Sequence, residues 1–317
     1  MRILVTGGLG TVGAGLVKEL RSRGHYVALC DLSHQPDEVG FSLRTDVSQP
    51  TYARCDVGEF RQIERVFDRL GPFDYVFHCA AEFGRWNGED FYETLWQTNA
   101  IGTKNLIRLQ EQRGFRLIHF SSSEVYGDWP DLMVESVMEQ YEVKQLNDYA
   151  MSKWVNEMQI RNSAVQYGTE SVVVRLFNTY GPGEYYSPYR SVNCRFLYCA
   201  LHGLPWTVFR GHARTSTYLA DTVRTVANIS ESFKPGETYN IGGNQMHSIE
   251  ELSDLILRIT GADPGLVEHR ESEVLTTKHK LVDVSKSVRD LGHRNSYGLE
   301  EGMRLTAAWM REVYNLR

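Results

Sequence analysis

The sequence of 317 residues lacks the features of a membrane, exported or nucleic-acid-binding protein. No apolar run approaches the roughly 20 residues that a membrane-spanning helix needs. The N-terminal MRILVTGG lacks the long apolar region and the small-residue cleavage site of a signal peptide. The net charge of −6 argues against a nucleic-acid or anionic-membrane surface. We therefore expect a cytoplasmic globular protein.

Cysteine is scarce, and its spacing matches no metal site. The five cysteines are Cys30, Cys55, Cys79, Cys194 and Cys199, and none forms a CxxC pair. An HExxH pattern is also absent, so we expect no metal. Three of the cysteines lie in or beside apolar, strand-like segments. Their odd number and these surroundings predict buried free thiols in a reducing compartment.

Apolar, strand-like runs alternate with amphipathic helical stretches in the first half of the chain. Strands covered by helices on both faces are almost continuously apolar, as these runs are. The alternation predicts an α/β fold with a doubly wound parallel sheet, the Rossmann arrangement. A polar stretch at 32–50 is predicted as a loop or a small excursion. The predicted strands are 2–5, 25–30, 52–57, 74–81, 116–120 and 170–176, and the predicted helices are 11–23, 59–70, 91–113 and 149–167.

The alternation ends after about residue 177. TYNIGG at 238–243 predicts one more strand of the main sheet, and 247–261 predicts a helix that begins at Ser248 with Glu251 three residues later. We expect a Rossmann domain at 1–176, with a return segment at about 217–243. Residues 177–317 are then a smaller substrate-binding domain.

A glycine-rich turn, TGGLGTVG, joins the first predicted strand to the first helix. Gly7, Gly10 and Gly13 permit a tight turn and a close approach to a pyrophosphate, which the helix N-terminus attracts. Asp31 ends the second strand, where it can accept a hydrogen bond from a ribose 2′-hydroxyl. No arginine follows within three residues to bind a 2′-phosphate, so the pattern favours NAD over NADP. The alternative interpretations are that the glycines only permit close packing of the helix on the strand, and that Asp31 is only a turn residue at the end of a strand.

Two further motifs carry groups for proton transfer. DYAMSK places Tyr149 and Lys153 on one face of a helix. The lysine can lower the pKa of the phenol and hold the nicotinamide ribose, so that the tyrosine acts as a base near neutrality. SSSEVYG at 121–127 places Glu124 among hydroxyls at the end of a strand. The alternative interpretations are that Tyr149 and Lys153 are only a surface pair, and that Glu124 is only a solvated loop residue.

Together these motifs resemble the extended short-chain dehydrogenase/reductase family, in its nucleotide-sugar epimerase/dehydratase branch. The resemblance also rests on CDV (55–57), VFHCAA (76–81), TNAIGTKNL (98–106), RLFNTYGP (175–182), RTSTYLAD (214–221) and YNIGG, which cover most of the chain. It implies NAD as cofactor and a homodimer packed through 91–113 and 149–167, with Trp96 and Trp154 as candidate contacts. The implied cofactor-binding residues are Gly7, Gly10, Thr11, Val12, Gly13, Asp31, Asp56, Val57, Ala80, Ala81, Asn99, Tyr149 and Lys153.

The same resemblance implies how a nucleotide sugar is held. Ser122 would hydrogen-bond the reacting sugar hydroxyl beside Tyr149. AAE at 80–82 resembles the 4,6-dehydratases and makes Glu82 a substrate contact. The residues at positions that hold the nucleotide diphosphate are Asn178, Val192, Phe209 and Arg214, with core packing as the alternative for Val192 and Phe209.

The implied chemistry begins when Tyr149 takes the proton of the sugar 4-hydroxyl while hydride leaves C4 for NAD. The ketone at C4 makes H5 acidic, and Glu124 lies where the 4,6-dehydratases place the base that removes it. Those enzymes carry Asp before this Glu, whereas this chain has Ser123, a poor proton donor. We therefore expect Glu124 to return the proton to the departing O6, a syn elimination. The expected catalytic residues are Ser122, Ser123, Glu124, Tyr149 and Lys153.

The favoured reaction is that of a UDP-N-acetylglucosamine 5,6-dehydratase, in which hydride returns to C4 and leaves a 5,6-alkene. Hydride delivery to C6 would make the enzyme a 4,6-dehydratase. A UDP-glucuronate decarboxylase is the next alternative, with Arg85 or Arg190 binding the carboxylate, and a 4-epimerase follows. A dinucleotide-binding regulator without catalysis is disfavoured because Ser122, Tyr149 and Lys153 are all present.

Overall fold

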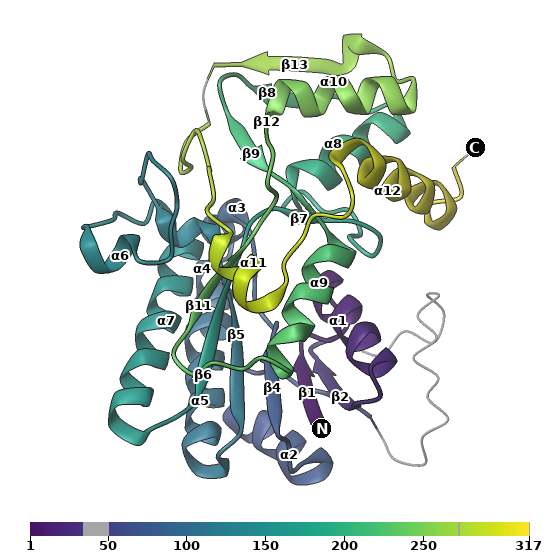
Figure 1. Ribbon diagram of the computed structural model, residues 1–317. Helices are drawn as coiled ribbons and strands as arrows, with labels where there is room; N and C mark the ends of the chain where they lie inside the picture. Colours follow the sequence, from purple (N-terminus) through teal and green to yellow (C-terminus); the bar gives the residue numbers. More distant parts are fainter. Residues whose placement is uncertain (34–50, 272, 317) are drawn as a thin grey trace.

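The computed structural model describes residues 1–33, 51–271 and 273–316. Residues 34–50 of the polar stretch predicted as a loop or small excursion lie outside this description. One large sheet carries helices on both of its faces, and the short elements β8, β9, β12, β13, α8, α10 and α12 pack beyond one end of the sheet (Figure 1). In this part of the chain, no helix is both long and apolar enough to cross a membrane.

The central sheet has seven parallel strands in the order β11-β6-β5-β4-β1-β2-β3. The predicted doubly wound α/β fold is confirmed. β11 lies at one edge, where Tyr239 is opposite Val174 of β6, so the strand predicted at 238–243 joins the main sheet. The strands are β1 (Arg2–Thr6), β2 (Tyr26–Asp31), β3 (Tyr52–Arg54), β4 (Tyr75–His78), β5 (Arg116–Ser122), β6 (Ser171–Leu176) and β11 (Thr238–Ile241).

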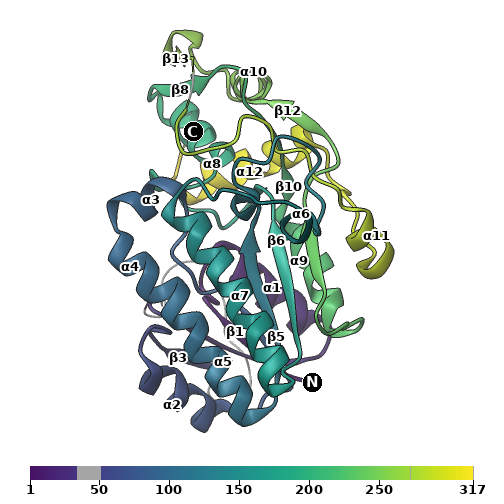
Figure 2. The same ribbon diagram turned by 90° about the vertical axis from the view of Figure 1, so that its left-hand side faces the viewer.

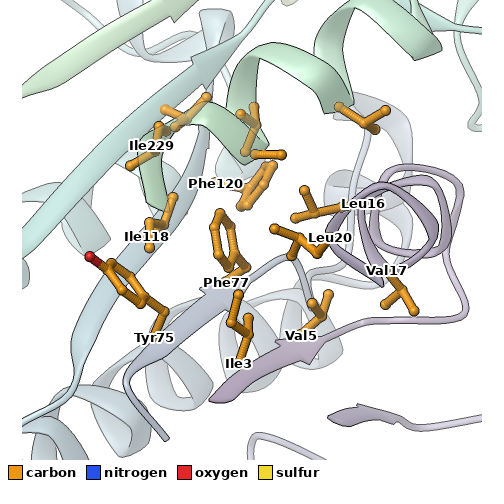
Figure 3. Packing of buried hydrophobic residues seen from close by; sticks show 14 of the residues in the cluster. Ile3, Val5, Leu16, Val17, Leu20, Tyr75, Phe77, Ile118, Phe120 and Ile229 are labelled. Atoms are coloured by element: carbon orange, nitrogen blue, oxygen red, sulfur yellow. The ribbon is translucent and has the colours of Figure 1, made fainter. Parts of the chain in front are cut away.

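Alternate side chains of the strands enter two separate cores. Ile3 and Val5 of β1 pack with Leu16 and Leu20 of the first helix (Figure 3). Leu4 belongs to the second core. Burying each of these side chains stabilises the fold by roughly 1.5–3 kcal/mol. The helices of the first face are α1 (Thr11–Ser22), α9 (Leu219–Ala227) and α11 (Ser285–Leu291), and those of the second are α2 (Phe60–Leu70), α5 (Gly102–Arg113) and α7 (Asp148–Tyr167).

The single helix predicted at 91–113 is interrupted. The structure has α4 (Tyr92–Trp96), a π-helical turn η1 (Gln97–Ile101) and then α5, and a short helix α3 (Arg85–Asp90) precedes them. The wider turn contains Asn99, which is 1% exposed and hydrogen-bonds the backbone of Glu82 through both its oxygen and its nitrogen. Hydrophobic spacing does not reveal such a turn, and π turns are frequent at functional sites.

The C-terminal part builds a third core from short elements. Tyr180, Phe196, Trp206, Leu252 and Met303 are buried in it. The helix expected at 247–261 is α10, and Ser248 and Glu251 form the capping box. The remaining elements are β7 (Thr179–Tyr180), α8 (Val192–His202), β8 (Trp206–Phe209), β9 (Ala213–Thr215), β10 (Thr217–Tyr218), η3 (Asn228–Ser230), β12 (Met246–Ser248), α10 (Ile249–Thr260), η4 (Pro264–Leu266), β13 (Val267–Arg270) and α12 (Leu299–Val313), with η2 (Ser123–Tyr126) and α6 (Val137–Gln140) inserted earlier.

Candidate active site

A cavity of about 640 Å³ opens at the carboxyl ends of the parallel strands, where they meet the C-terminal part. Ligands bind at this end of open α/β sheets. Every residue named as a site residue from the sequence lines this cavity except Asn99. Asn99 lies behind the wall and holds the backbone of Glu82 there.

The turn after β1 leaves no room for side chains. A Cβ on Gly7 would lie 2.7 Å from the backbone nitrogen of Ala80, and one on Gly13 would lie 2.1 Å from the carbonyl oxygen of Gly7. Gly7 also has φ +65°, a conformation that glycine adopts readily. Gly10 is the N-cap of α1 and has no side chain to cap the helix, and the first residues of the helix line the cavity. This cradle fits a dinucleotide pyrophosphate.

The far end of the cavity is lined by Asp31, Asp56 and Val57. Asp31 accepts hydrogen bonds from the backbone N–H of Leu9 and of Ser33, each at 3.0 Å, which fix its carboxylate beside the glycine turn. Asp56 accepts from the N–H of Gly58 at 2.8 Å. Two carboxylates at the end of this cavity suit ribose and adenine and disfavour an added 2′-phosphate.

Tyr149 and Lys153 lie on the first turns of α7, which Asn147 caps through the N–H of Ala150 at 2.8 Å. Lys153 is 3% exposed, and its Nζ donates to the carbonyl oxygen of Phe120 at 2.8 Å. Burial lowers the pKa of Lys153 to about 8. Burial raises the pKa of Tyr149 to about 12, although a hydrogen bond with Ser122 opposes this.

This direction differs from the lowering of the tyrosine pKa that we expected from Lys153. The lysine Nζ lies 5.9 Å from the centre of the Tyr149 ring and is engaged with a backbone carbonyl. At that distance its electrostatic effect is smaller than the cost of burying a phenolate. In this structure, Tyr149 is therefore a neutral phenol near pH 7.

Glu124 is not a solvated loop residue. It follows Ser122 and Ser123, both buried, in the short helix η2, and its side chain is 19% exposed. Its Oε1 lies 2.5 Å from the Nζ of Lys280. Burial would raise the pKa of Glu124, but Lys280 and the nearby guanidinium of Arg85 outweigh burial and lower it. Glu124 is thus an ionised carboxylate beside the Tyr149–Ser122 pair.

No motif in the sequence pointed to Lys280. It lies between β13 and α11, in the segment 273–284, which we call the strap (Figure 1). Lys280 is 3% exposed, and burial lowers its pKa to about 8 although Glu124 opposes the change. The strap contains no helix and no named strand, and Lys280 is 156 positions from Glu124, so only the fold brings the two residues together.

The strap also engages Arg214, which we expected at the diphosphate. Its guanidinium donates to the carbonyl oxygens of Ala213 and Lys278, at 2.8 and 2.7 Å, and to the hydroxyl of Thr276 at 3.0 Å. Burial lowers the pKa of Arg214, although Glu124 opposes the change. The guanidinium therefore lies near the carboxylate and the strap.

Further arginines line the cavity. Arg85 forms an ion pair with Glu273 of the strap at 2.9 Å, and Arg190 lies 4.3 Å over the ring of Phe83. Arg190 and Arg195 each have a buried Nε without a hydrogen-bond partner among the described residues. Unpaired buried guanidinium nitrogens facing a cavity favour an anionic ligand there.

The remaining predicted residues lie on the same walls. Glu82 accepts a hydrogen bond from the Asn87 amide at 3.0 Å. Asn178 follows β6, Val192 begins α8 and Phe209 ends β8, and all three line the cavity. The five cysteines are free thiols, four of them buried. Among the residues that the structure describes, no group of three or more His, Cys, Asp or Glu side chains could hold a metal ion.

Comparison with known proteins gives one family and several reactions. Residues 3–242 match the family described as "NAD dependent epimerase/dehydratase family". The chain is 29% identical to a UDP-N-acetyl-alpha-D-glucosaminuronate decarboxylase of Bacillus cytotoxicus, over 99% of both chains. It is 30% identical to UDP-glucuronic acid decarboxylase 1 of Xenopus tropicalis, over 98% of this chain and 72% of the relative. It is 26% identical to a dTDP-glucose 4,6-dehydratase of Salmonella typhimurium, over 98% and 92%.

Solved structures agree on the fold. A UDP-glucose 4-epimerase of Thermotoga maritima with UDP-glucose superposes with a TM-score of 0.87 at 27% identity, covering 99% of this chain and 100% of that one. A UDP-glucose 4-epimerase of Thermus thermophilus in complex with NAD gives 0.84 at 26% identity, covering 98% and 99%. These proteins carry out different reactions on similar architectures, so the reaction of this chain has to be argued from its own side chains.

Proposed function

The chain belongs to the NAD-dependent epimerase/dehydratase family, and we propose that within this family it is a nucleotide-sugar dehydratase. It is an NAD-dependent enzyme that modifies nucleotide sugars. The specific reaction that we propose is the 5,6-dehydration of UDP-N-acetylglucosamine. The Ser123–Glu124 pair resembles the enzyme that performs this reaction in tunicamycin biosynthesis.

Residues 1–176, with the return segment 217–243, would hold NAD, and residues 177–317 would hold most of the nucleotide sugar. The glycine cradle, Asp31 and Lys153 are the residues placed to bind NAD. Bound NAD supplies a reversible hydride acceptor. The buried, unpaired nitrogens of Arg190 and Arg195 support a diphosphate site on the opposite wall, where they would add to or replace Arg214.

Tyr149 would accept the proton of the sugar 4-hydroxyl, and Ser122 would orient that hydroxyl. The pKa of Tyr149 is about 12 here, so the phenol must lose its proton before it can act as a base. The two groups that favour this loss are the Ser122 hydroxyl, which hydrogen-bonds the phenol, and the Lys153 cation, which lies 5.9 Å from the ring centre. Both come from elements that the sheet holds rigidly.

One observation carries the choice of a dehydratase: Glu124 is an ionised carboxylate held beside the Tyr149–Ser122 pair by Lys280. A 4-epimerase needs only to flip its 4-keto intermediate within the site, so it has no use for a second base. A ketone at C4 makes H5 acidic, and a carboxylate is a suitable base for it. We propose that Glu124 removes H5 and that water then leaves from C6.

A second candidate, a UDP-hexuronate decarboxylase, is supported by the cations around Glu124. Lys280, Arg85 and Arg214 all lower the pKa of this carboxylate, so they would also attract a substrate carboxylate. Relatives with this activity match the whole length of the chain. Arg85, which we named for this role, is already paired with Glu273, which weakens that part of the alternative.

We also propose a homodimer that packs through α4, η1, α5 and α7, which lie side by side on one face of the molecule (Figure 2). Large apolar side chains are exposed there at Tyr92, Ile101, Met151 and Met158. Trp96 and Trp154, our candidate contacts, are better explained by internal packing. Trp96 donates to Asp148 at 2.8 Å, and Trp154 packs beside the buried cluster of Val125 and Tyr126.

The test is incubation of the purified protein with UDP-N-acetylglucosamine, with and without added NAD. A product lighter by one water, with vinylic protons in the NMR spectrum, is expected. A new methyl signal instead would indicate a 4,6-dehydratase. Glu124→Gln should abolish water loss, and the exposed Glu142→Gln should not. Carbon dioxide release from UDP-glucuronate, without any water loss from the first substrate, would replace the proposal with the decarboxylase.

A further inference from the structure

We infer that Lys280 is the acid that protonates the departing C6 hydroxyl, in place of the aspartate that Ser123 has replaced. This inference rests on the proposed dehydratase function and deepens it. It assigns a catalytic role to a residue from the strap and removes the need for Glu124 to act both as the base and as the acid.

The position of Lys280 fits this role. Its Nζ lies 2.5 Å from Oε1 of Glu124, which is the proposed base for H5. H5 and O6 are on adjacent carbon atoms of the sugar, so an acid and a base in hydrogen-bond contact can reach both groups from one side. Ser123 is buried at the neighbouring position, but a hydroxyl is a poor donor near neutral pH.

The surroundings also make Lys280 an available acid. Burial lowers its pKa to about 8, so it is protonated at pH 7 yet gives up its proton more readily than an exposed lysine. Acids are most effective when their pKa lies near the working pH. The charged groups facing it are Glu124 of η2, Arg214 of β9 and Arg85 of α3. The carboxylate favours the charged lysine, and the two arginines oppose it.

The step balances without another reactant. Glu124 takes H5, and the electron pair of that C–H bond forms the enolate of the 4-ketone. The enolate then expels the C6 oxygen as the C5–C6 double bond forms. Lys280 gives a proton to that oxygen, which leaves as water. Glu124 is now a neutral acid beside a neutral Lys280 amine, and one proton transfer along their hydrogen bond restores both groups.

The strap holds Lys280 in this place. Its backbone N–H donates to the carbonyl of Ala213 at 3.3 Å, and the carbonyl of Leu281 accepts from Met133 at 2.8 Å. Thr277 donates to the carbonyl of Gly127, just after η2. The strap is thereby attached to the same loop that carries Glu124, so the acid and the base are positioned relative to each other.

Lys280→Arg is the discriminating variant, because arginine keeps the cation that holds Glu124 ionised but cannot give up a proton near neutrality. The holoenzyme is incubated with UDP-N-acetylglucosamine in D₂O. NMR measures deuterium at C5 of the recovered substrate, and mass spectrometry measures water loss. Lys278→Arg is the matched control, since Lys278 lies on the same strap with an exposed side chain.

We expect Lys280→Arg to slow water loss on the order of 100-fold or more while exchange at C5 stays within a few-fold of the unaltered enzyme. Undiminished water loss would overturn the inference and return the acid role to Glu124. Equal losses of exchange and of water loss would also overturn it, because Lys280 would then only position Glu124. No exchange and no water loss in the unaltered enzyme would overturn the proposed function together with the inference.

A measurement on the unaltered enzyme does not depend on a variant folding. The ratio of water loss to C5 exchange should be constant below about pH 8 and should fall above it, as Lys280 loses its proton. A ratio that stays level to pH 9.5 would contradict the role of Lys280 as acid.

Discussion

Lys153, which lines the cavity, and Lys280, which pairs with the cavity residue Glu124, come from two regions that are built in different ways. Both are 3% exposed, and burial lowers the pKa of both to about 8. Lys153 stands on α7, and its partner is the backbone carbonyl of Phe120. Lys280 stands on the extended strap, and its partner is the carboxylate of Glu124. The same exposure and the same pKa therefore do not mean the same function.

The difference lies in what each lysine can exchange with its partner. A carbonyl oxygen accepts a hydrogen bond but cannot take the proton, so Lys153 remains a fixed cation near Tyr149. A carboxylate can take and return a proton, so Lys280 and Glu124 form a pair that can be reset. The comparison teaches that the partner decides whether a buried lysine provides charge or protons. Each prediction below tests this distinction.

The largest effect is expected on the rates of C5 exchange and water loss, compared between Lys153→Met and Lys280→Arg. Removing the cation near Tyr149 should slow both C5 exchange and water loss, on the order of 10²–10⁴-fold, because both need the oxidation at C4. Lys280→Arg should slow water loss only. NMR exchange and mass spectrometry on the same samples provide the measurement. If Lys153→Met kept C5 exchange at the original rate, the two lysines would not act at different steps.

The ion pair that anchors α7 should contribute more to stability than the ion pair that anchors the strap. Glu157 of α7 is fully buried and lies 2.7 Å from the buried Arg175. Glu157→Gln leaves that guanidinium uncompensated and should cost about 3–5 kcal/mol of the free energy of unfolding. Glu273→Gln breaks the Arg85 pair of the strap, whose side chains are 17% and 12% exposed, and should cost about 1 kcal/mol.

Urea unfolding of both variants measures these costs. The unaltered protein and the exposed Glu142→Gln are the references. Equal losses for Glu157→Gln and Glu273→Gln would show that the strap is anchored as firmly as α7.

Removing each charge should affect stability in opposite directions at pH 7. Lys280→Met leaves Glu124 without its nearest cation and should lower the free energy of unfolding by about 2 kcal/mol. Lys153→Met removes a buried charge that has no carboxylate partner and should raise it by about 1 kcal/mol. Thermal and urea unfolding of the two variants test this pair. Losses of similar size in both would mean that the carbonyl of Phe120 compensates Lys153 as well as a carboxylate would.

The same buried charge should also appear in the pH dependence of stability. The ordinary lysine pKa is 10.5, and the folded value is about 8, so between these pH values the unfolded chain binds protons that the folded chain has lost. The free energy of unfolding therefore rises with pH in this window, by at most about 1.4 kcal/mol per pH unit for Lys153. Below pH 8 its destabilising effect is fully present. Lys153→Met should reduce this rise between pH 8 and 10 and leave the part that comes from Lys280, whereas Lys278→Met should leave the whole rise unchanged.

Much of the fold followed from the sequence because its signals are local. The apolar runs covered on both faces, the glycine turn and the Ser248–Glu251 cap each depend on neighbouring residues, and each is present in the structure. The π turn at Gln97–Ile101 was missed, since one extra residue in a helix hardly changes the spacing of apolar side chains.

The sequence indicated the site residues that belong to short motifs, but it did not indicate the residue that the strap contributes. Glu124, Tyr149 and Ser122 belong to short motifs on β5, η2 and α7. Lys280 belongs to an extended segment whose contacts are hydrogen bonds with the backbones of distant loops, and no periodicity reports such contacts. The expected lowering of the Tyr149 pKa was also a motif-level argument, and burial, which depends on the whole fold, reverses it.

The late position of the strap in the chain has a consequence during protein synthesis. The glycine cradle, Glu124 and Tyr149 all lie within the first half of the polypeptide, whereas β11 and Lys280 come after residue 237. Once residue 149 has been translated, the nascent chain contains Glu124 and Tyr149 but not yet the lysine that pairs with Glu124. The ion pair between Glu124 and Lys280 can therefore form only after residue 280 has been added to the chain.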